Sequence, residues 1–315
     1  MKLRAYLLML FVVAVWGSTF VVVKAALADA TPAAFNLARM TLAFVVLAVG
    51  YHRYWRKIRR WQVAAGAMVG LCLAVGYQFQ TTGLARTTPS KSAFITGLMV
   101  VMVPLLSTIP GLRPAGAMAP RWNAFLGAAL AFIGIVLLTA PATALAQGAP
   151  SLLSQAAHLL PDMTSINLGD LLTLGCATGF AFHCLALSHV SPRIGFQPLA
   201  LLQVGFCALF MALSLPLIEH PHITWTPRVM AALAVCAVLS TAVAFSIQSW
   251  AQSVLPPTHT ALLLTLEPVF AWVTSFVVMG ERLGLRAASG ALLILAGIAL
   301  TELMPQPYLP TAHEA

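Results

Sequence analysis

Residues 127–137 read GAALAFIGIVL, and residues 290–300 read GALLILAGIAL. Six of the eleven positions are identical when these two segments are aligned. Each segment also follows a proline at nearly the same distance: Pro104 lies 23 residues before the first glycine of the earlier segment, and Pro268 lies 22 residues before that of the later one. Leu and Ala match easily by chance in apolar sequence, whereas paired glycines after a paired proline indicate an internal repeat.

The composition around these segments is that of a membrane protein. Of the 315 residues, 60% are hydrophobic and 8% are charged, whereas a soluble domain carries about 25% charged residues. A chain this apolar does not stay solvated, so the composition also excludes disorder. The apolar runs are continuous and about 20 residues long, which is the length that a helix needs to cross a bilayer, and they lack the alternation of a transmembrane barrel. The sequence therefore predicts an all-α polytopic membrane protein.

Polar residues, prolines and glycines divide the apolar sequence into ten expected transmembrane helices. An odd number of spans per repeat gives the two halves opposite orientations, so the sequence predicts two inverted five-helix repeats. We expect a first repeat over residues 1–141, a connecting loop over 142–168, a second repeat over 169–304 and a tail over 305–315. The ten expected spans are 5–24, 31–51, 62–83, 91–110, 122–141, 169–190, 196–217, 228–250, 258–279 and 285–304.

Basic residues in the loops indicate the orientation in the membrane. If the N-terminus is inside, the inside loops of the first half hold nine Lys and Arg residues and its outside loops hold three. The second half weakly favours the opposite orientation, because its inside loops hold one basic residue and its outside loops hold three. We therefore expect both termini in the cytoplasm and the 142–168 loop outside. The net charge of +9 is concentrated in loops, and the dense run at residues 53–60 fits anchoring better than nucleic-acid binding.

No enzyme, metal or cofactor motif stands out. The sequence lacks a P-loop, an HExxH zinc pair and a GxSxG nucleophile elbow. The eight acidic residues are mostly dispersed, which disfavours catalysis by paired carboxylates. The five cysteines lie in apolar segments without CxxC spacing, and we interpret them as packing residues.

Three ionisable residues, Arg39, His183 and Glu267, fall inside expected spans and away from their ends. Each needs a reason, because a charge at a helix centre costs about 2.5–3.5 kcal/mol on insertion scales. Glu267 directly precedes Pro268, which removes a helical hydrogen bond and bends the helix beside the carboxylate, and Pro104 is expected to bend span 4 in the same way. Transporters place substrate and ion sites at such points. An alternative to a transport site has equal support: the prolines only bend the helices for packing, and Glu267 forms an ion pair with Arg39.

Aromatic and polar side chains also fall in helical stripes on spans 1, 3, 6, 8 and 9, which is the pattern expected around a cavity. Packing between helices is the alternative, and it is strongest for Ser, Thr and His183. The candidate substrate-binding residues are Trp16, Tyr77, Gln80, His183, Gln248, Trp250 and Glu267. The candidates for helix bending or gating are Arg39, Pro104 and Pro268.

Several motifs occur in a recognisable order along residues 5–304. They are WGSTF at 16–20, Pro32 with Phe35 and Arg39, Pro104, EPV at 267–269, GERL at 280–283, and Gly290 with Gly297. In this order and spacing the chain resembles the EamA family of the drug/metabolite transporter superfamily. The resemblance implies two inverted EamA-like repeats, a bacterial inner membrane and transport of small metabolites, often outward. Two departures are residues 111–114, which lack an acidic residue that the family often shows, and the long 142–168 loop.

We therefore predict a secondary active transporter and not an enzyme. It is expected to export small metabolites, such as amino acids or related compounds, as the two repeats rock around a central cavity. The expected partners are this substrate, the lipid bilayer and a coupling proton carried by Glu267, with no cofactor, metal or nucleic acid. An intramembrane enzyme and a non-transporting scaffold or channel stay open as the other function classes.

Overall fold

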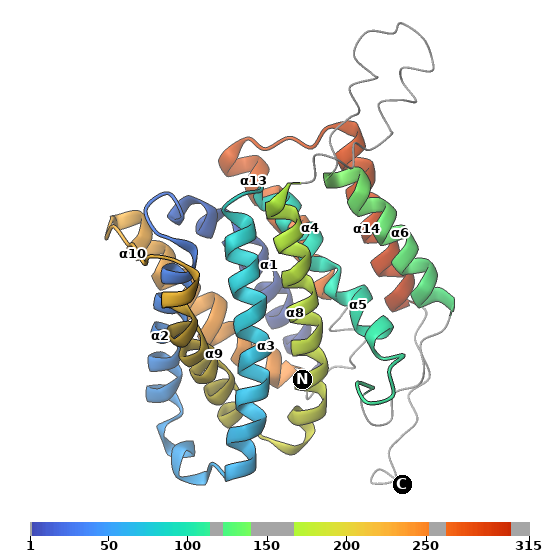
Figure 1. Ribbon diagram of the computed structural model, residues 1–315. Helices are drawn as coiled ribbons and strands as arrows, with labels where there is room; N and C mark the ends of the chain where they lie inside the picture. Colours follow the sequence, from blue (N-terminus) through green and yellow to red (C-terminus); the bar gives the residue numbers. More distant parts are fainter. Residues whose placement is uncertain (1, 114–121, 140–166, 252–262, 304–315) are drawn as a thin grey trace, which may run out of the picture.

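A computed structural model describes residues 2–113, 122–139, 167–251 and 263–303 (Figure 1). In the first half, the helices follow one another with short connections. They are α1 (Lys2–Ala26), α2 (Pro32–Gly50), the short 3-10 helix η1 (His52–Lys57), α3 (Arg60–Leu84), α4 (Pro89–Gly97), α5 (Met99–Leu106) and α6 (Trp122–Thr139).

The second half is also built of successive helices. They are α8 (Leu168–Val190), the 3-10 turn η4 (Ser191–Arg193), α9 (Phe196–Ile218), α10 (Pro227–Ala234), the π-helix η5 (Val235–Val243), α11 (Ala244–Ala251), α13 (Glu267–Met279) and α14 (Leu285–Leu303). Most of the expected 142–168 loop, the start of the expected ninth span and the expected 305–315 tail lie outside the described residues.

Ten apolar helical units account for the predicted spans within the described ranges. Seven are long and apolar enough to cross a membrane by length and composition. In three of these the unit is assembled from consecutive helices: α4 with α5, α8 with η4, and α10 with η5 and α11. Three shorter apolar helices, Trp122–Leu138, Glu267–Met279 and Leu285–Thr301, supply the rest. The predicted fold of ten transmembrane helices in two inverted five-helix repeats is confirmed.

The contacts between helices map onto themselves when the two repeats are exchanged. The fifth helices of the repeats, α6 and α14, pack together, and so do the second helices, α2 and α9. The contact of α1 with α13 has its counterpart in the contact of α8 with α4 and α5. Figure 1 shows the α6–α14 pair at one side of the bundle and the α2–α9 pair at the other. This pattern is what two repeats related by a pseudo-two-fold axis require.

The repeated glycines face each other across the α6–α14 contact. A Cβ atom added at Gly127 would lie 2.5 Å from the carbonyl oxygen of Gly297, and one added at Gly134 would lie 2.6 Å from that of Gly290. The first glycine of one repeat therefore opposes the second glycine of the other, which is possible only if the helices run antiparallel. Small residues allow this close approach of the two backbones. In a bilayer no hydrophobic effect drives helices together, so this close van der Waals packing stabilises the pair.

Spans 4 and 9 are both interrupted in the middle. In span 4, α4 ends at Gly97 and α5 begins at Met99, so the break falls before the turn that contains Pro104. In span 9, two turn residues precede α13, and Pro268 stands in the first turn of that helix. A proline in a first turn removes no helical hydrogen bond, because the N–H at that position has no partner within the helix. Span 9 is therefore broken ahead of Glu267 rather than bent within a continuous helix.

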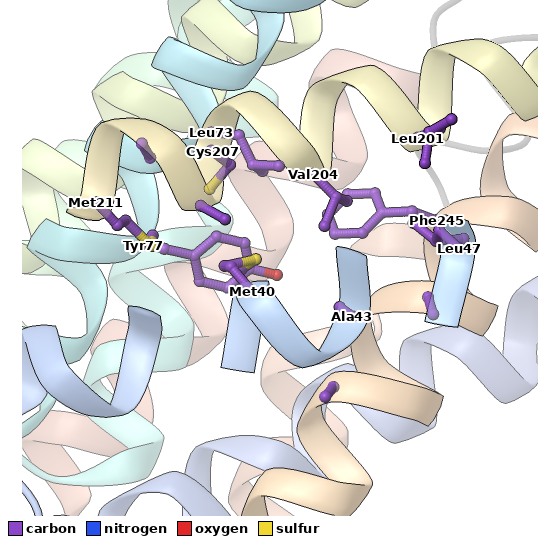
Figure 2. Packing of buried hydrophobic residues seen from close by; sticks show 14 residues of the cluster. Met40, Ala43, Leu47, Leu73, Tyr77, Leu201, Val204, Cys207, Met211 and Phe245 are labelled. Carbon is purple, nitrogen blue, oxygen red and sulfur yellow. The ribbon is translucent and has the colours of Figure 1, made fainter. Parts of the chain in front are cut away.

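Span 8 contains a π-helix that the sequence did not predict. Within η5 the hydroxyl of Thr241 donates to the carbonyl of Cys236, five residues earlier, at 2.7 Å. A large apolar cluster packs between η5, α11 and helices α2, α3 and α9. Figure 2 shows its side chains, among them Met40, Tyr77, Cys207 and Phe245. This cluster holds span 8 against the α2–α9 pair.

The α6–α14 contact yields a prediction about stability. Gly127→Ala is expected to lower the thermal stability of the detergent-purified protein, because overpacking of a close contact typically costs about 1–3 kcal/mol. Gly50→Ala is the matched control, since it lies at the end of α2 with no atom within 4 Å of the added Cβ. The measurement is the melting temperature by size-exclusion recovery after heating, and equal melting temperatures for both variants would contradict the proposed contact.

Candidate transport cavity

A cavity lies between the two repeats and is lined by residues of both. Its walls come from α1, α2, α3, the α4–α5 unit, α8, η5, α11 and α13. The non-atom space between the lining residues, including the part open to solvent, is about 720 Å³. Both repeats therefore contribute residues to one shared space.

Six of the seven residues that the sequence predicted to bind substrate line this cavity. They are Trp16, Tyr77, Gln80, His183, Gln248 and Glu267. The stripes on spans 1, 3, 6 and 8 thus converge on one space, and Arg39 also lines it. Phe180, Phe245 and Cys184 add further aromatic, apolar and thiol surface.

Trp250 does not join these residues. It lines a second, more open cavity with Arg4, Leu8 and Phe196 among others, toward the N-terminal end of α1. Successive residues of a helix are rotated by about 100°, so a residue two positions after Gln248 points to nearly the opposite side. Neither cavity is lined by Pro104 or Pro268 among the described residues.

Arg39 is the best-anchored polar side chain of the cavity wall. It is only 3% exposed. Its Nε donates to the Thr241 hydroxyl at 2.9 Å, and its Nη2 donates to the hydroxyls of Ser240 at 3.0 Å and Tyr77 at 3.2 Å. The guanidinium carbon also lies 4.5 Å from the centre of the Tyr77 ring, a cation–π distance. Arg39 therefore connects α2 with α3 and with the π-helix of span 8.

Glu267 is not the partner of Arg39. No ion pair joins the two residues, and the Glu267 carboxyl makes no hydrogen bond to another side chain or backbone group of the described ranges. Its backbone packs closely on α1, where a Cβ added at Gly17 would lie 2.6 Å from the Glu267 carbonyl oxygen. This contact explains the need for glycine in the WGSTF motif. The predicted alternative of an Arg39–Glu267 ion pair is thus not observed.

Trp16 and His183 each have a defined polar partner. The Trp16 indole N–H donates to the carbonyl of Ser240 at 2.8 Å. His183 is 4% exposed, and its Nε2 lies 2.9 Å from Oε1 of Gln203 on α9, an amide oxygen that can only accept. Gln203 was not among the residues predicted from the sequence, although a glutamine inside an apolar span indicates a buried hydrogen-bond partner. These bonds fix the indole and imidazole rings in the cavity wall.

Gln248 offers an open acceptor. It is 6% exposed, and its Oε1 has no hydrogen-bond partner in the described part of the chain. Buried polar atoms normally have a partner. Together with the Glu267 carboxyl, Gln248 gives the cavity two acceptors that a bound molecule with N–H or O–H groups can satisfy.

A polar network closes one end of the bundle. The ammonium of Lys24 at the end of α1 donates to the carbonyls of Leu84, Ala85 and Thr87 at 2.8–3.0 Å, and so caps the end of α3. Glu281 follows the left-handed Gly280 (φ 69°) that ends α13 and accepts from the Ser90 hydroxyl at 2.7 Å in the first turn of α4. The GERL motif therefore has a structural reason at this position. We find no group of three or more possible metal ligands in the described ranges.

These features define a class: an integral membrane protein with a polar cavity between two inverted five-helix repeats. The model of the EamA-like transporter family matches residues 3–140 and 167–303. The chain therefore belongs to the EamA-like transporter family, within the drug/metabolite transporter superfamily, as its motifs indicated.

Two relatives agree with this assignment, and a solved structure agrees with the fold. An uncharacterized transporter of Archaeoglobus fulgidus is 28% identical over 96% of this chain and 87% of its own length, and a second one is 23% identical over 96% and 98%. A crystal structure of another protein matches with a TM-score of 0.59 at 18% identity, over 96% of this chain and 98% of that one. At this identity the last match bears on the fold alone.

The position of Cys184 in the cavity wall gives a prediction about access. In a variant that retains only Cys184, a small charged methanethiosulfonate reagent is expected to label the thiol, since this residue is half-buried and faces the cavity. The matched control retains only Cys207, which is fully buried in the apolar cluster. Mass spectrometry of the intact protein reports the labelling, and comparable labelling of both variants would speak against a water-filled cavity.

Proposed function

We propose that this transporter is a secondary active exporter of small metabolites, such as amino acids or related compounds, and that it works by alternating access. The observation that carries the proposal is the cavity between the repeats, in which the guanidinium of Arg39 and the carboxyl of Glu267 both lack an ionic partner among the described residues. Buried charges that lack a partner within the protein are expected to meet one in a ligand. A small molecule with both an acidic and an amino group would supply a partner for the guanidinium and a partner for the carboxyl.

The arrangement of the helices supports alternating access. Inverted repeats place the substrate site at their interface, and one repeat rocks against the other around that site. The polar network at one end joins the ends of α1 and α3 and links α13 to α4, and these contacts have to open when the cavity opens to that side. The broken middles of spans 4 and 9 lie beside the cavity, where Met99 and Glu267 line it.

Glu267 is proposed to carry the coupling proton. Its carboxyl faces the cavity at the start of α13 and has no partner in the described chain, so a proton or a substrate ammonium can occupy it in turn. Competition between the proton and the substrate for one group would then couple their fluxes.

We place the protein in a bacterial inner membrane with both termini in the cytoplasm. The proposed repeats are residues 1–141 and 169–304, with the 142–168 connection outside and the 305–315 tail inside. The nine basic residues of the first-half inside loops against three outside support this orientation. Lys24, Ser90 and Glu281 then belong to the extracytoplasmic end of the bundle.

The orientation is tested with C-terminal reporter fusions in Escherichia coli. A fusion to green fluorescent protein after the tail is expected to fluoresce, and the matching alkaline phosphatase fusion is expected to be inactive. Fusions placed in the 142–168 connection are expected to give the reverse result. An active phosphatase at the C-terminus would refute the proposed orientation.

The transport function is tested with purified protein in liposomes. A screen of amino acids, nucleosides, sugars and cationic drugs, with and without a pH gradient, is expected to find gradient-driven transport of small metabolites. Glu267→Gln is expected to abolish the response to the gradient, because the amide cannot carry a proton. Glu219→Gln is the control, since this residue lies in a peripheral loop and its acceptor to the Ala34 N–H survives in glutamine.

Wild-type rate and pH dependence in Glu267→Gln would eliminate the proposed proton carrier. Absence of transport for the whole screen by the wild-type protein would contradict the substrate class itself. Conversion of a lipid or peptide instead of its movement would favour the enzyme alternative.

A further inference from the structure

The hydrogen bonds of Arg39 leave a defined part of its guanidinium unused. The group has five N–H donors. Nε–H donates to Thr241, and the two hydrogens of Nη2 serve Ser240 and Tyr77. The two hydrogens of Nη1 have no partner among the described residues, and Nη1 is absent from the fully enclosed polar atoms that lack one. Since Arg39 lines the cavity, Nη1 is the part of the group that is open to it.

The partners of Arg39 satisfy hydrogen bonds but do not neutralise its charge. All three are hydroxyl groups, and the Thr241 hydroxyl uses its own hydrogen on the Cys236 carbonyl, so its oxygen is committed to accept from Nε. Arginine keeps its charge in proteins. A buried cation is expected to have an anion beside it, and no carboxylate of the described chain fills that place.

The remainder of the cavity indicates what kind of anion fits. Arg39 supplies one positive charge, and the other basic group of the lining, His183, is already engaged with Gln203. A carboxylate carries a single charge that Arg39 can neutralise, whereas a phosphate monoester would leave excess negative charge beside Glu267. The rings of Trp16 and Phe245 give the same cavity an apolar wall for the rest of the molecule.

We propose that Arg39 binds the carboxylate of the transported metabolite through Nη1, and that Ser240 and Thr241 are positioning residues that hold the guanidinium in this orientation. The proposal rests on the transport function proposed above and gives Arg39 a role in recognition instead of the bending or gating role predicted from the sequence. Because Ser240 and Thr241 belong to the π-helix η5, the unusual turn of span 8 serves to present two neighbouring hydroxyls to one side chain. The Gln248 Oε1 is then available for the amino group of the same molecule.

The test compares free acids with their uncharged amides. The probes are the standard amino acids and their primary amides, and the measurement is inhibition of transport of the amino acid that the liposome screen shows to be moved most strongly. The free acid is expected to inhibit about 10- to 100-fold more strongly than its amide, which corresponds to one charge-assisted hydrogen bond. Equal inhibition by acid and amide in the wild-type protein would overturn the proposal while leaving the transport function intact.

Three variants separate recognition from folding. Arg39→Gln is expected to lose the preference for the acid, Arg39→Lys to retain part of it, and Thr241→Val to reduce it without removing it, because Ser240 and Tyr77 still hold Nη2. Elution of each variant as a single species on size exclusion shows that it is folded. If Arg39→Gln does not fold, the Lys and Val variants decide: an unchanged ratio of acid to amide in both would overturn the proposal. A purely structural role of Arg39 would change expression or stability and leave this ratio unchanged.

Discussion

The buried guanidinium of Arg39 is the interaction on which the centre of the molecule depends. It joins α2 to α3 through Tyr77 and to span 8 through Ser240 and Thr241, and each of these partners comes from a helix that also lines the cavity. A cation inside a membrane protein is expensive to bury, so the structure supplies three hydroxyls and an aromatic face to hold it.

Inverted symmetry provides the frame around this centre. The Gly127–Gly297 and Gly134–Gly290 contacts hold the fifth helices of the repeats together, and the apolar cluster in Figure 2 holds the second helices against span 8. The cavity lies between these two contacts and takes residues from both repeats. Its charged and polar groups differ between the repeats: the guanidinium comes from the first repeat, and Glu267 and Gln248 come from the second. The binding site is therefore asymmetric although the backbone is pseudo-symmetric.

Much of the fold and part of the site could be predicted from the sequence. The paired glycines and prolines indicated an internal repeat, and the odd number of spans in each repeat indicated that the repeats are inverted. Six of the seven candidate binding residues line one cavity. Trp250 lies outside this cavity, because a position two residues after Gln248 faces nearly the opposite side of the helix. The π-helix and the break at Leu98 could not be predicted, since both depend on contacts between distant helices. The hydrogen bonds of Arg39 to Thr241 and Ser240 could not be predicted either, since these two residues are about 200 positions away along the chain.

Counterflow in proteoliposomes tests most directly whether this cavity carries a metabolite by alternating access. Vesicles are loaded with an excess of an unlabelled metabolite found in the transport screen and diluted into a trace of the labelled compound without a pH gradient. For a carrier, the label is expected to accumulate inside transiently above its equilibrium level, because a carrier exchanges one molecule for another across the membrane. A simple approach to equilibrium without overshoot, as a channel gives, or no uptake above protein-free vesicles, would contradict it.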